Sequence, residues 1–165
     1  MSEGLVFIAY SALIGGGATV VMDLWAVFIK RYFDIPSLNY SMVGRWIGHI
    51  PKGKFIHVSI LQAEPVKGEG GIGWFFHYLI GIIFAGILLL IWGLEWAKNP
   101  TFLPALIISL VTLVAPFFIM QPCMGMGIAA SKTPAPNTLR LRSLMAHTSY
   151  GIGLYLAALF LTLFS

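Results

Sequence analysis

The sequence predicts an all-α membrane protein in which four transmembrane helices form a bundle and an amphipathic helix lies at the membrane interface. Hydrophobic residues make up 58% of the 165-residue chain and charged residues only 10%, against about 45–50% and about 25% in soluble domains. The mean hydropathy of +0.87 agrees with this class. The composition excludes a disordered chain, a coiled coil, a collagen-like fibre and an ordinary soluble enzyme. The single cysteine excludes an intramolecular disulfide.

Four apolar stretches are long enough to cross a bilayer core, which takes about 20 residues of helix. They span residues 5–29, 72–94, 102–120 and 144–164. Asp23 is the one formal charge inside them. Because backbone groups in lipid must pair within their own helix, each stretch is predicted to be helical, with a kink in the third at Pro116. We therefore expect one integral membrane domain over residues 1–165.

The basic residues are unevenly distributed between the segments that connect these spans. Six of the ten Lys and Arg residues lie in residues 30–71, and three more lie in residues 121–143. Because cytoplasmic loops are enriched in Lys and Arg, both segments are predicted to be cytoplasmic and both termini to lie outside. The first helix is expected to be permanent rather than a signal peptide, since residues 1–3 contain no basic residue.

The first cytoplasmic segment is predicted to contain an interfacial helix that begins after an N-cap at Ser37. Apolar side chains recur at every fourth position, at Leu38, Met42, Trp46 and Ile50, while Arg45 and His49 share another face. Such an amphipathic helix lies in the plane of the membrane interface, with Trp46 at headgroup depth. His49 and His57 are therefore expected to be solvated or interfacial.

Four polar side chains are predicted to occupy one layer in the cytoplasmic leaflet, counting about 1.5 Å per residue along each helix. They are Asp23, His77, Gln121 and His147. Small residues recur on the same helical faces, at positions 11, 15 and 19, at 73, 81 and 85, and at 143 and 151. Because membrane helices touch along small residues, Asp23, His77 and His147 are expected to point into the bundle.

Three roles are open for this layer. Bonds between Asp23 and a histidine, or from a histidine to the backbone, would fix helix packing. A carboxylate beside imidazoles that titrate near neutral pH would instead handle protons or ions. Asp23, His77 and His147 would also suit a metal ion, and His77 with His147 a haem, although no tight ligand spacing supports either. The sequence names no cofactor.

The cytoplasmic segments carry two further sets of candidate residues. Three sulfur-containing side chains that suit Cu(I), Cys123, Met124 and Met126, lie close together in the sequence. A simpler explanation of this group is that apolar spans are generally rich in Met. A basic rim consists of Arg45, His49, Lys132, Arg140 and Arg142. Its expected partners are anionic lipid headgroups, with a phosphate-bearing substrate as the alternative, and no nucleic acid is expected. No catalytic motif occurs, so an enzyme is not indicated.

Five segments together resemble a known family. They are residues 17–25 (GATVVMDLW), 35–40 (IPSLNY), 43–49 (VGRWIGH), 115–122 (APFFIMQP) and 127–134 (GIAASKTP). This set is similar to the bacterial inner-membrane family catalogued as domain of unknown function 2938, and the similarity extends over nearly the whole chain. The resemblance implies a bacterial inner-membrane protein of about four spans, and it implies no activity.

The leading functional hypothesis is the movement of protons or of a small solute, with Asp23 and either His77 or His147 as the proton-handling group. Four spans in 165 residues enclose little volume, so a transport path is expected to require a homodimer. The first alternative is a protein that binds a metal or haem through Asp23, His77 and His147. The second is a packing or accessory subunit without small-molecule chemistry.

Overall fold

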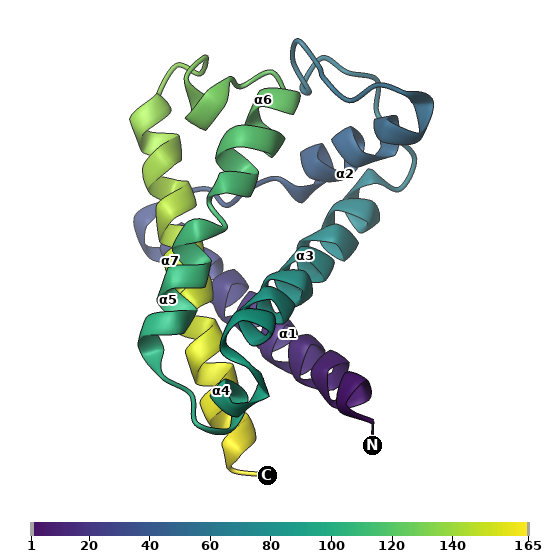
Figure 1. Ribbon diagram of the computed structural model, residues 1–165. Coiled ribbons are helices and arrows are strands. Elements are labelled where there is room, and N and C mark those ends of the chain that lie inside the picture. The colour runs from purple at the N-terminus through teal and green to yellow at the C-terminus, as the bar shows by residue number, and fades with distance from the viewer. Residues whose placement is uncertain (1, 165) are drawn as a thin grey trace. The chain divides into compact units, whose positions relative to one another are not determined.

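The computed structural model describes residues 2–164, and the secondary structure assigned to them is helical (Figure 1). The long helices are α1 (Glu3–Phe33), α3 (Glu69–Trp92) and α7 (Pro136–Thr162). The shorter elements are α2 (Tyr40–His49), the 3-10 helix η1 (Ile50–Lys52), α4 (Leu94–Lys98), α5 (Phe102–Val111), the π-helix η2 (Ala115–Met120), α6 (Gln121–Cys123) and the 3-10 helix η3 (Ile128–Ala130).

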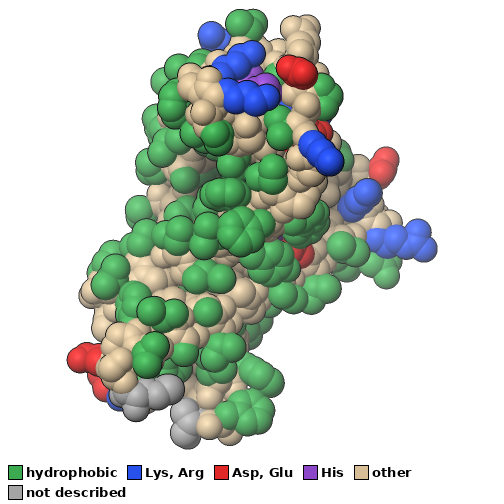
Figure 2. Space-filling view, turned by 90° about the vertical axis from the view of Figure 1, so that its right-hand side faces the viewer, with side chains coloured by type: hydrophobic (Ala, Val, Ile, Leu, Met, Phe, Trp, Pro, Cys, Tyr) green, Lys and Arg blue, Asp and Glu red, His purple; other side chains and the backbone are tan. Residues whose placement is uncertain are grey.

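Four helical stretches are long and apolar enough to cross a membrane, which confirms the predicted architecture of a multi-pass membrane protein. They are Glu3–Phe33, Glu69–Trp92, Phe102–Cys123 and Pro136–Thr162. Large hydrophobic side chains remain exposed on them, and Figure 2 shows such side chains spread over the face in view. The short helix α2 lies between the first two spans, as predicted.

Helix boundaries differ from the predicted ones because helical hydrogen bonding continues past the apolar residues. α7 begins at Pro136, eight residues before the predicted start of the fourth span. Proline is well tolerated there, since the first helical residue needs no hydrogen bond from its nitrogen. α1 continues to Phe33 and ends at Asp34, whose φ of 52° is left-handed. α2 begins after the N-cap Asn39, whose side chain accepts from the Ser41 amide, and not after Ser37.

The α-helix of the third span breaks just before Pro116, the residue at which the sequence predicts a kink. The α-helical segment α5 ends at Val111, and the π-helix η2 begins at Ala115. Proline lacks the amide hydrogen that would continue the regular ladder, and a π-helical turn is one way to accommodate this loss.

The chain folds into two compact units, and the three membrane-length helical stretches that follow α1 each contribute to both. Unit 1 comprises Met1–Ser37, Tyr78–Thr112 and Met145–Ser165. Unit 2 comprises Leu38–His77 and Leu113–Leu144. Seven of the ten Lys and Arg residues belong to unit 2.

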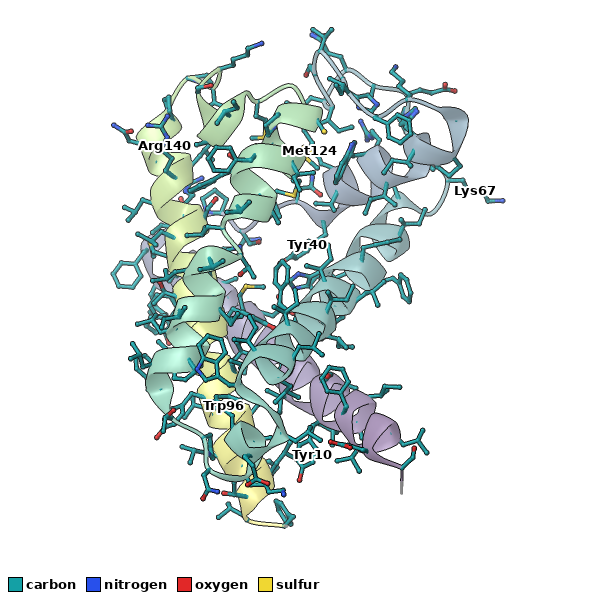
Figure 3. The ribbon with its side chains drawn as sticks, viewed as in Figure 1. Tyr10, Tyr40, Lys67, Trp96, Met124 and Arg140 are labelled. Carbon is teal, nitrogen blue, oxygen red and sulfur yellow. The ribbon has the colours of Figure 1, made fainter. Side chains whose placement is uncertain are left out.

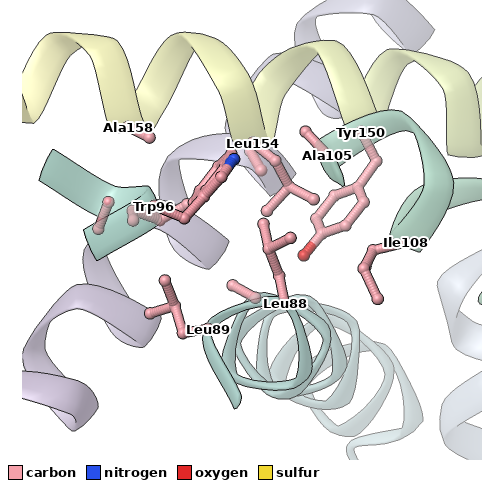
Figure 4. Close-up of a cluster of buried hydrophobic side chains, with 12 residues drawn as sticks. Leu88, Leu89, Trp96, Ala105, Ile108, Tyr150, Leu154 and Ala158 are labelled. Atoms are coloured by element: carbon pink, nitrogen blue, oxygen red, sulfur yellow. The ribbon is translucent and has the colours of Figure 1, made fainter. Parts of the chain in front are cut away.

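Unit 1 has a core of apolar side chains packed between its helices. Figure 4 shows Leu88 of α3 beside Leu154 and Tyr150 of α7, and all three are buried. Small residues let the helices approach closely: a Cβ added to Gly15 of α1 would lie 2.6 Å from the Cα of Ile82. This is the small-residue packing predicted for the first and second spans.

Unit 2 is built around the start of α3 and two connecting segments. Gly44 of α2 and Gly73 of α3 allow close backbone approach, because an added Cβ would overlap the backbone of Glu69 or of Tyr40, respectively. A small apolar core forms around Val43, Ile60 and Met124; Met124 is labelled in Figure 3.

Candidate functional site

Asp23, the one charge expected inside the spans, forms a hydrogen bond with a tyrosine of unit 1. The phenol of Tyr78 on α3 donates to Asp23 Oδ2 on α1 over 2.9 Å. Asp23 is partly buried. An ionisable side chain inside a membrane helix costs about 2.5–3.5 kcal/mol on insertion scales, so it usually faces protein or water rather than lipid. The Tyr78 bond is one such protein contact.

The neighbouring layer of unit 1 is packed tightly around buried hydroxyl groups. Thr19 is fully buried, and its hydroxyl donates to the Gly15 carbonyl over 2.8 Å. A Cβ on Gly81 would overlap Thr19 Oγ1. The hydroxyl of Tyr150 donates to the Gly81 carbonyl over 2.6 Å. The small-residue faces predicted at positions 15, 19 and 81 are therefore true helix contacts.

His147 of α7 is held by polar groups of α5 and its C-cap. Its Nδ1 lies 2.9 Å from the Ser109 carbonyl oxygen and 3.2 Å from Thr112 Oγ1. Thr112 Oγ1 itself donates to the Ser109 carbonyl over 2.9 Å. Because a carbonyl only accepts, Nδ1 carries the proton in this bond and a neutral ring keeps its lone pair on Nε2. One of the histidine–backbone bonds considered from the sequence is therefore present.

The other two members of the predicted layer, His77 and Gln121, belong to unit 2. The His77 ring lies against two aromatic rings, with centroid distances of 4.2 Å to Tyr40 and 5.5 Å to Trp74. Gln121 is buried, and its Nε2 lies 3.4 Å from Ser143 Oγ, a long hydrogen bond. Its Oε1 is buried without a hydrogen-bond partner among the described residues. The predicted meeting of all four side chains stays a prediction.

A metal site from the predicted ligands gains no support. Within residues 2–164, no group of three or more His, Cys, Asp or Glu side chains is placed to hold a metal ion. Met124 is buried in the apolar core of unit 2 with Met126 packed against it, and Cys123 is a partly buried free thiol.

The predicted basic rim divides into buried and exposed members. Lys132 and Arg140 are exposed, and Arg142 is partly exposed. Arg140 donates from Nε to the Ala129 carbonyl over 2.8 Å. Arg45 instead forms a paired contact with Glu69, in which Nη2 and Oε1 are 2.8 Å apart and only 17% and 18% of the two side chains is exposed. Arg45 therefore acts inside unit 2, and the Glu69 partnership raises its pKa.

His49 and His57 were expected to be solvated or interfacial; both are buried inside the protein and so are not solvated, and an interfacial position stays a prediction. The reason for the burial is that the buried face of α2 contains Val43, Gly44 and His49. The repeat of apolar residues at every fourth position had suggested a different face. Trp46, predicted to lie among lipid headgroups, donates from its indole to the Phe55 carbonyl over 2.8 Å. These contacts join residues of α2 to the chain that follows it.

Sequence reasoning missed Tyr78, Thr112 and Tyr150 as parts of the polar layer. Tyr78 directly follows His77, and Tyr150 lies three residues after His147, so a search for hydroxyl groups beside the candidate ionisable residues would have found both. His57 had no such signal, because its burial depends on contacts with a segment more than sixty residues away.

The comparison with protein-family models matches residues 12–161 to the family described as a protein of unknown function, DUF2938. The chain belongs to the DUF2938 family. Membership confirms the family resemblance seen in the sequence motifs, and both Asp23 and His147 of this DUF2938 protein lie inside the matched region. No significant match was found among curated proteins or among solved structures.

Proposed function

We propose that this DUF2938 protein moves protons, or a small solute coupled to protons, across the bacterial inner membrane, with Asp23 as the proton-handling group. The observation that carries the proposal is the hydrogen bond of 2.9 Å from Tyr78 to the Asp23 carboxylate, between two helices of membrane-spanning length. Ionisable residues are costly and rare inside membrane helices, and they commonly mark ion and proton pathways.

The chemistry of the pair suits reversible protonation. A phenol is a neutral donor, so the Tyr78 bond itself positions the carboxylate without adding a charge beside it. Tight packing of Gly15, Thr19 and Gly81 around the same helices keeps the geometry rigid. Asp23 is then a defined site that accepts a proton from one side of the membrane and releases it to the other.

His147 is the second proton-handling candidate in unit 1. Its Nδ1 is oriented by the Ser109 carbonyl, which leaves the lone pair of the neutral ring on Nε2. An imidazole held in one tautomer by a backbone carbonyl is suited to accept a proton at the other nitrogen. His77, one residue before Tyr78 on α3, stays a candidate for the same role.

The membrane setting of the proposal follows from the basic residues. With the segments after α1 and before α7 in the cytoplasm, Lys132 and Arg140 face anionic lipid headgroups. A second copy of the chain supplies the volume that a transport path through so small a protein requires. No observation favours a metal or haem at Asp23, His77 and His147. If the protein transports nothing, the remaining alternative is an accessory subunit.

The test uses the full chain reconstituted into lipid vesicles that contain a pH-sensitive dye. A potassium diffusion potential drives protons, and the initial rate of internal pH change is the readout. We expect the unmodified protein to conduct protons and Asp23→Asn to abolish the flux, since an amide cannot take up a proton. Tyr78→Phe is expected to reduce the flux and change its pH dependence, because the carboxylate loses its positioning bond.

Matched controls come from the same end of α1. Asp34→Asn and Tyr32→Phe change a carboxyl and an exposed tyrosine outside the proposed site, and they should leave the flux unchanged. Proton conduction without a co-transported solute is refuted if the unmodified protein gives no flux above protein-free vesicles. The proposal also fails if a folded Asp23→Asn variant conducts at the unmodified rate.

A further inference from the structure

Two buried histidines of unit 2 have no part in the proposed proton pathway. His49 is the last residue of α2 and His57 follows η1, and 5% and 4% of their surfaces is exposed. Their ring centroids are 5.1 Å apart and the ring planes are inclined by 68°. Buried histidines this close, in a segment that connects two spans, need a physical explanation.

The backbone around His57 is held in place by the end of α6 and the residues that follow it. The His57 amide donates to the Cys123 carbonyl over 2.8 Å, and the Ile60 amide donates to the Met124 carbonyl over 3.0 Å. Gly125, with a φ of 87°, lies so close that an added Cβ would overlap the Val58 carbonyl. The buried position of the His57 ring is thus set by main-chain contacts between distant segments.

The two rings differ in how their nitrogens are used. His49 Nε2 lies 2.9 Å from the Glu64 carbonyl oxygen, so this nitrogen carries the proton and Nδ1 of the neutral ring keeps the lone pair. Metal-binding histidines characteristically donate their other ring N–H to a carbonyl or carboxylate in this way. The Glu64 carbonyl therefore orients the His49 ring with its free lone pair available to a ligand.

Neither ring nitrogen of His57 has a hydrogen-bond partner among residues 2–164, although both are buried. Burial is the main cause that lowers the pKa of His57, and the positive charge of Lys54 acts in the same direction, whereas the backbone of Cys123 acts in the opposite direction without reversing the shift. The neutral ring is therefore favoured. An unpaired buried nitrogen is unfavourable, because it has given up its bonds to water without replacement.

We propose that His49 and His57 form a binding site for a transition-metal ion of the zinc or copper(I) class. Two imidazoles bonded to one tetrahedral ion at about 2.0–2.1 Å place their ring centroids about 5 Å apart. The 5.1 Å between His49 and His57 matches that spacing. A bound ion also gives a His57 nitrogen the partner that the described residues do not provide.

Imidazole ligands select the class of ion. Neutral nitrogen ligands suit zinc and copper, whereas magnesium and calcium prefer oxygen. The described residues provide no third His, Cys, Asp or Glu ligand. The ion would therefore keep open coordination positions, unlike the ion of a structural zinc site, which is bound by four protein ligands. Because the site lies in unit 2, it does not depend on the role proposed for Asp23.

The test measures metal binding by the full chain in detergent. Metal-free protein is titrated with Zn²⁺, and separately with Cu⁺ under reducing conditions, against a chromophoric chelator, with Mg²⁺ as the negative probe. We expect one equivalent of Zn²⁺ or Cu⁺ to bind, and X-ray absorption of the loaded protein to show two imidazole ligands. His49→Gln and His57→Gln should each weaken binding by at least about tenfold.

Lys52→Gln is the matched control, since it changes an exposed side chain of η1 in the same unit and should leave metal affinity unchanged. Circular dichroism of the metal-free variants shows whether each one is folded. The proposal is overturned if the unmodified protein retains neither Zn²⁺ nor Cu⁺ above a detergent blank. It is equally overturned if X-ray absorption shows fewer than two imidazoles, a readout that needs no variant.

Discussion

The guanidinium of Arg45 and the carboxylate of Glu69 form a double hydrogen bond that joins α2 to the start of α3. Arg45 Nε and Nη2 donate to Glu69 Oε2 and Oε1, each over 2.8 Å. Arg45 Nη1 also donates to the Ala63 carbonyl over 3.2 Å, and the Val66 amide donates to Glu69 Oε2 over 3.0 Å. One arginine therefore connects three separate stretches of unit 2.

Replacing this arginine by lysine is predicted to destabilise the protein. Lysine keeps the charge but cannot form two parallel bonds to one carboxylate while also reaching Ala63. We expect Arg45→Lys to lower the Tm in detergent by about 4 °C, a typical size for the loss of a part-buried contact. Lys98→Gln, in the exposed pair with Glu95, is the control and should change the Tm little. Equal shifts for the two variants would contradict the prediction.

Two adjacent glycines of α1 are predicted to respond in opposite ways to alanine. An added Cβ at Gly15 would lie 2.6 Å from the Ile82 Cα and force two helices apart, whereas nothing lies within 4 Å of one at Gly16. We expect Gly15→Ala to cost about 2 kcal/mol through overpacking. Gly16→Ala should be neutral or stabilising by up to about 1 kcal/mol, because alanine favours helix. Urea or detergent unfolding followed by tryptophan fluorescence measures both.

Gly125 is predicted to tolerate no side chain. Its φ of 87° is unfavourable for other residues, and an added Cβ would overlap the Val58 carbonyl. Gly68 has a similar φ of 76° with open space around it, so Gly68→Ala carries only the conformational cost, about 1 kcal/mol. Gly125→Ala should therefore lower the yield of folded protein in size-exclusion chromatography far more than Gly68→Ala. Similar yields would show that the contact with Val58 is unimportant.

The hydroxyl of Tyr150 is predicted to stabilise unit 1 through its bond to the Gly81 carbonyl. The side chain is buried, and the bond is 2.6 Å long. Tyr150→Phe removes the donor and leaves a buried carbonyl with one bond fewer, at a cost of about 1–2 kcal/mol. Tyr155→Phe is the control on the same helix, since Tyr155 makes its aromatic contact with Phe102 through its ring. An unfolding midpoint for Tyr150→Phe that equals the control would refute the role of this hydroxyl.

The candidate site was predictable only in part. Asp23 and His147 stand out in the sequence because a charge or an imidazole is rare in apolar spans. Such a residue can be recognised from its own span alone, without knowledge of the fold. Their partners Tyr78, Thr112 and Ser109 are common residues whose roles depend on which helix faces which. The His49–His57 pair was missed for the same reason, since apolar residues at every fourth position of α2 do not reveal which face of the helix is buried.

The sequence by itself determined the four membrane helices, because a bilayer selects for runs of apolar residues and forces each run to satisfy its own backbone hydrogen bonds. It also indicated the small-residue faces, since a glycine or serine stripe is visible in a single helix. Only the tertiary structure decided which polar groups meet and which histidines are buried. Those outcomes depend on contacts such as His57 with Cys123, between segments far apart along the chain, which no local pattern of residues encodes.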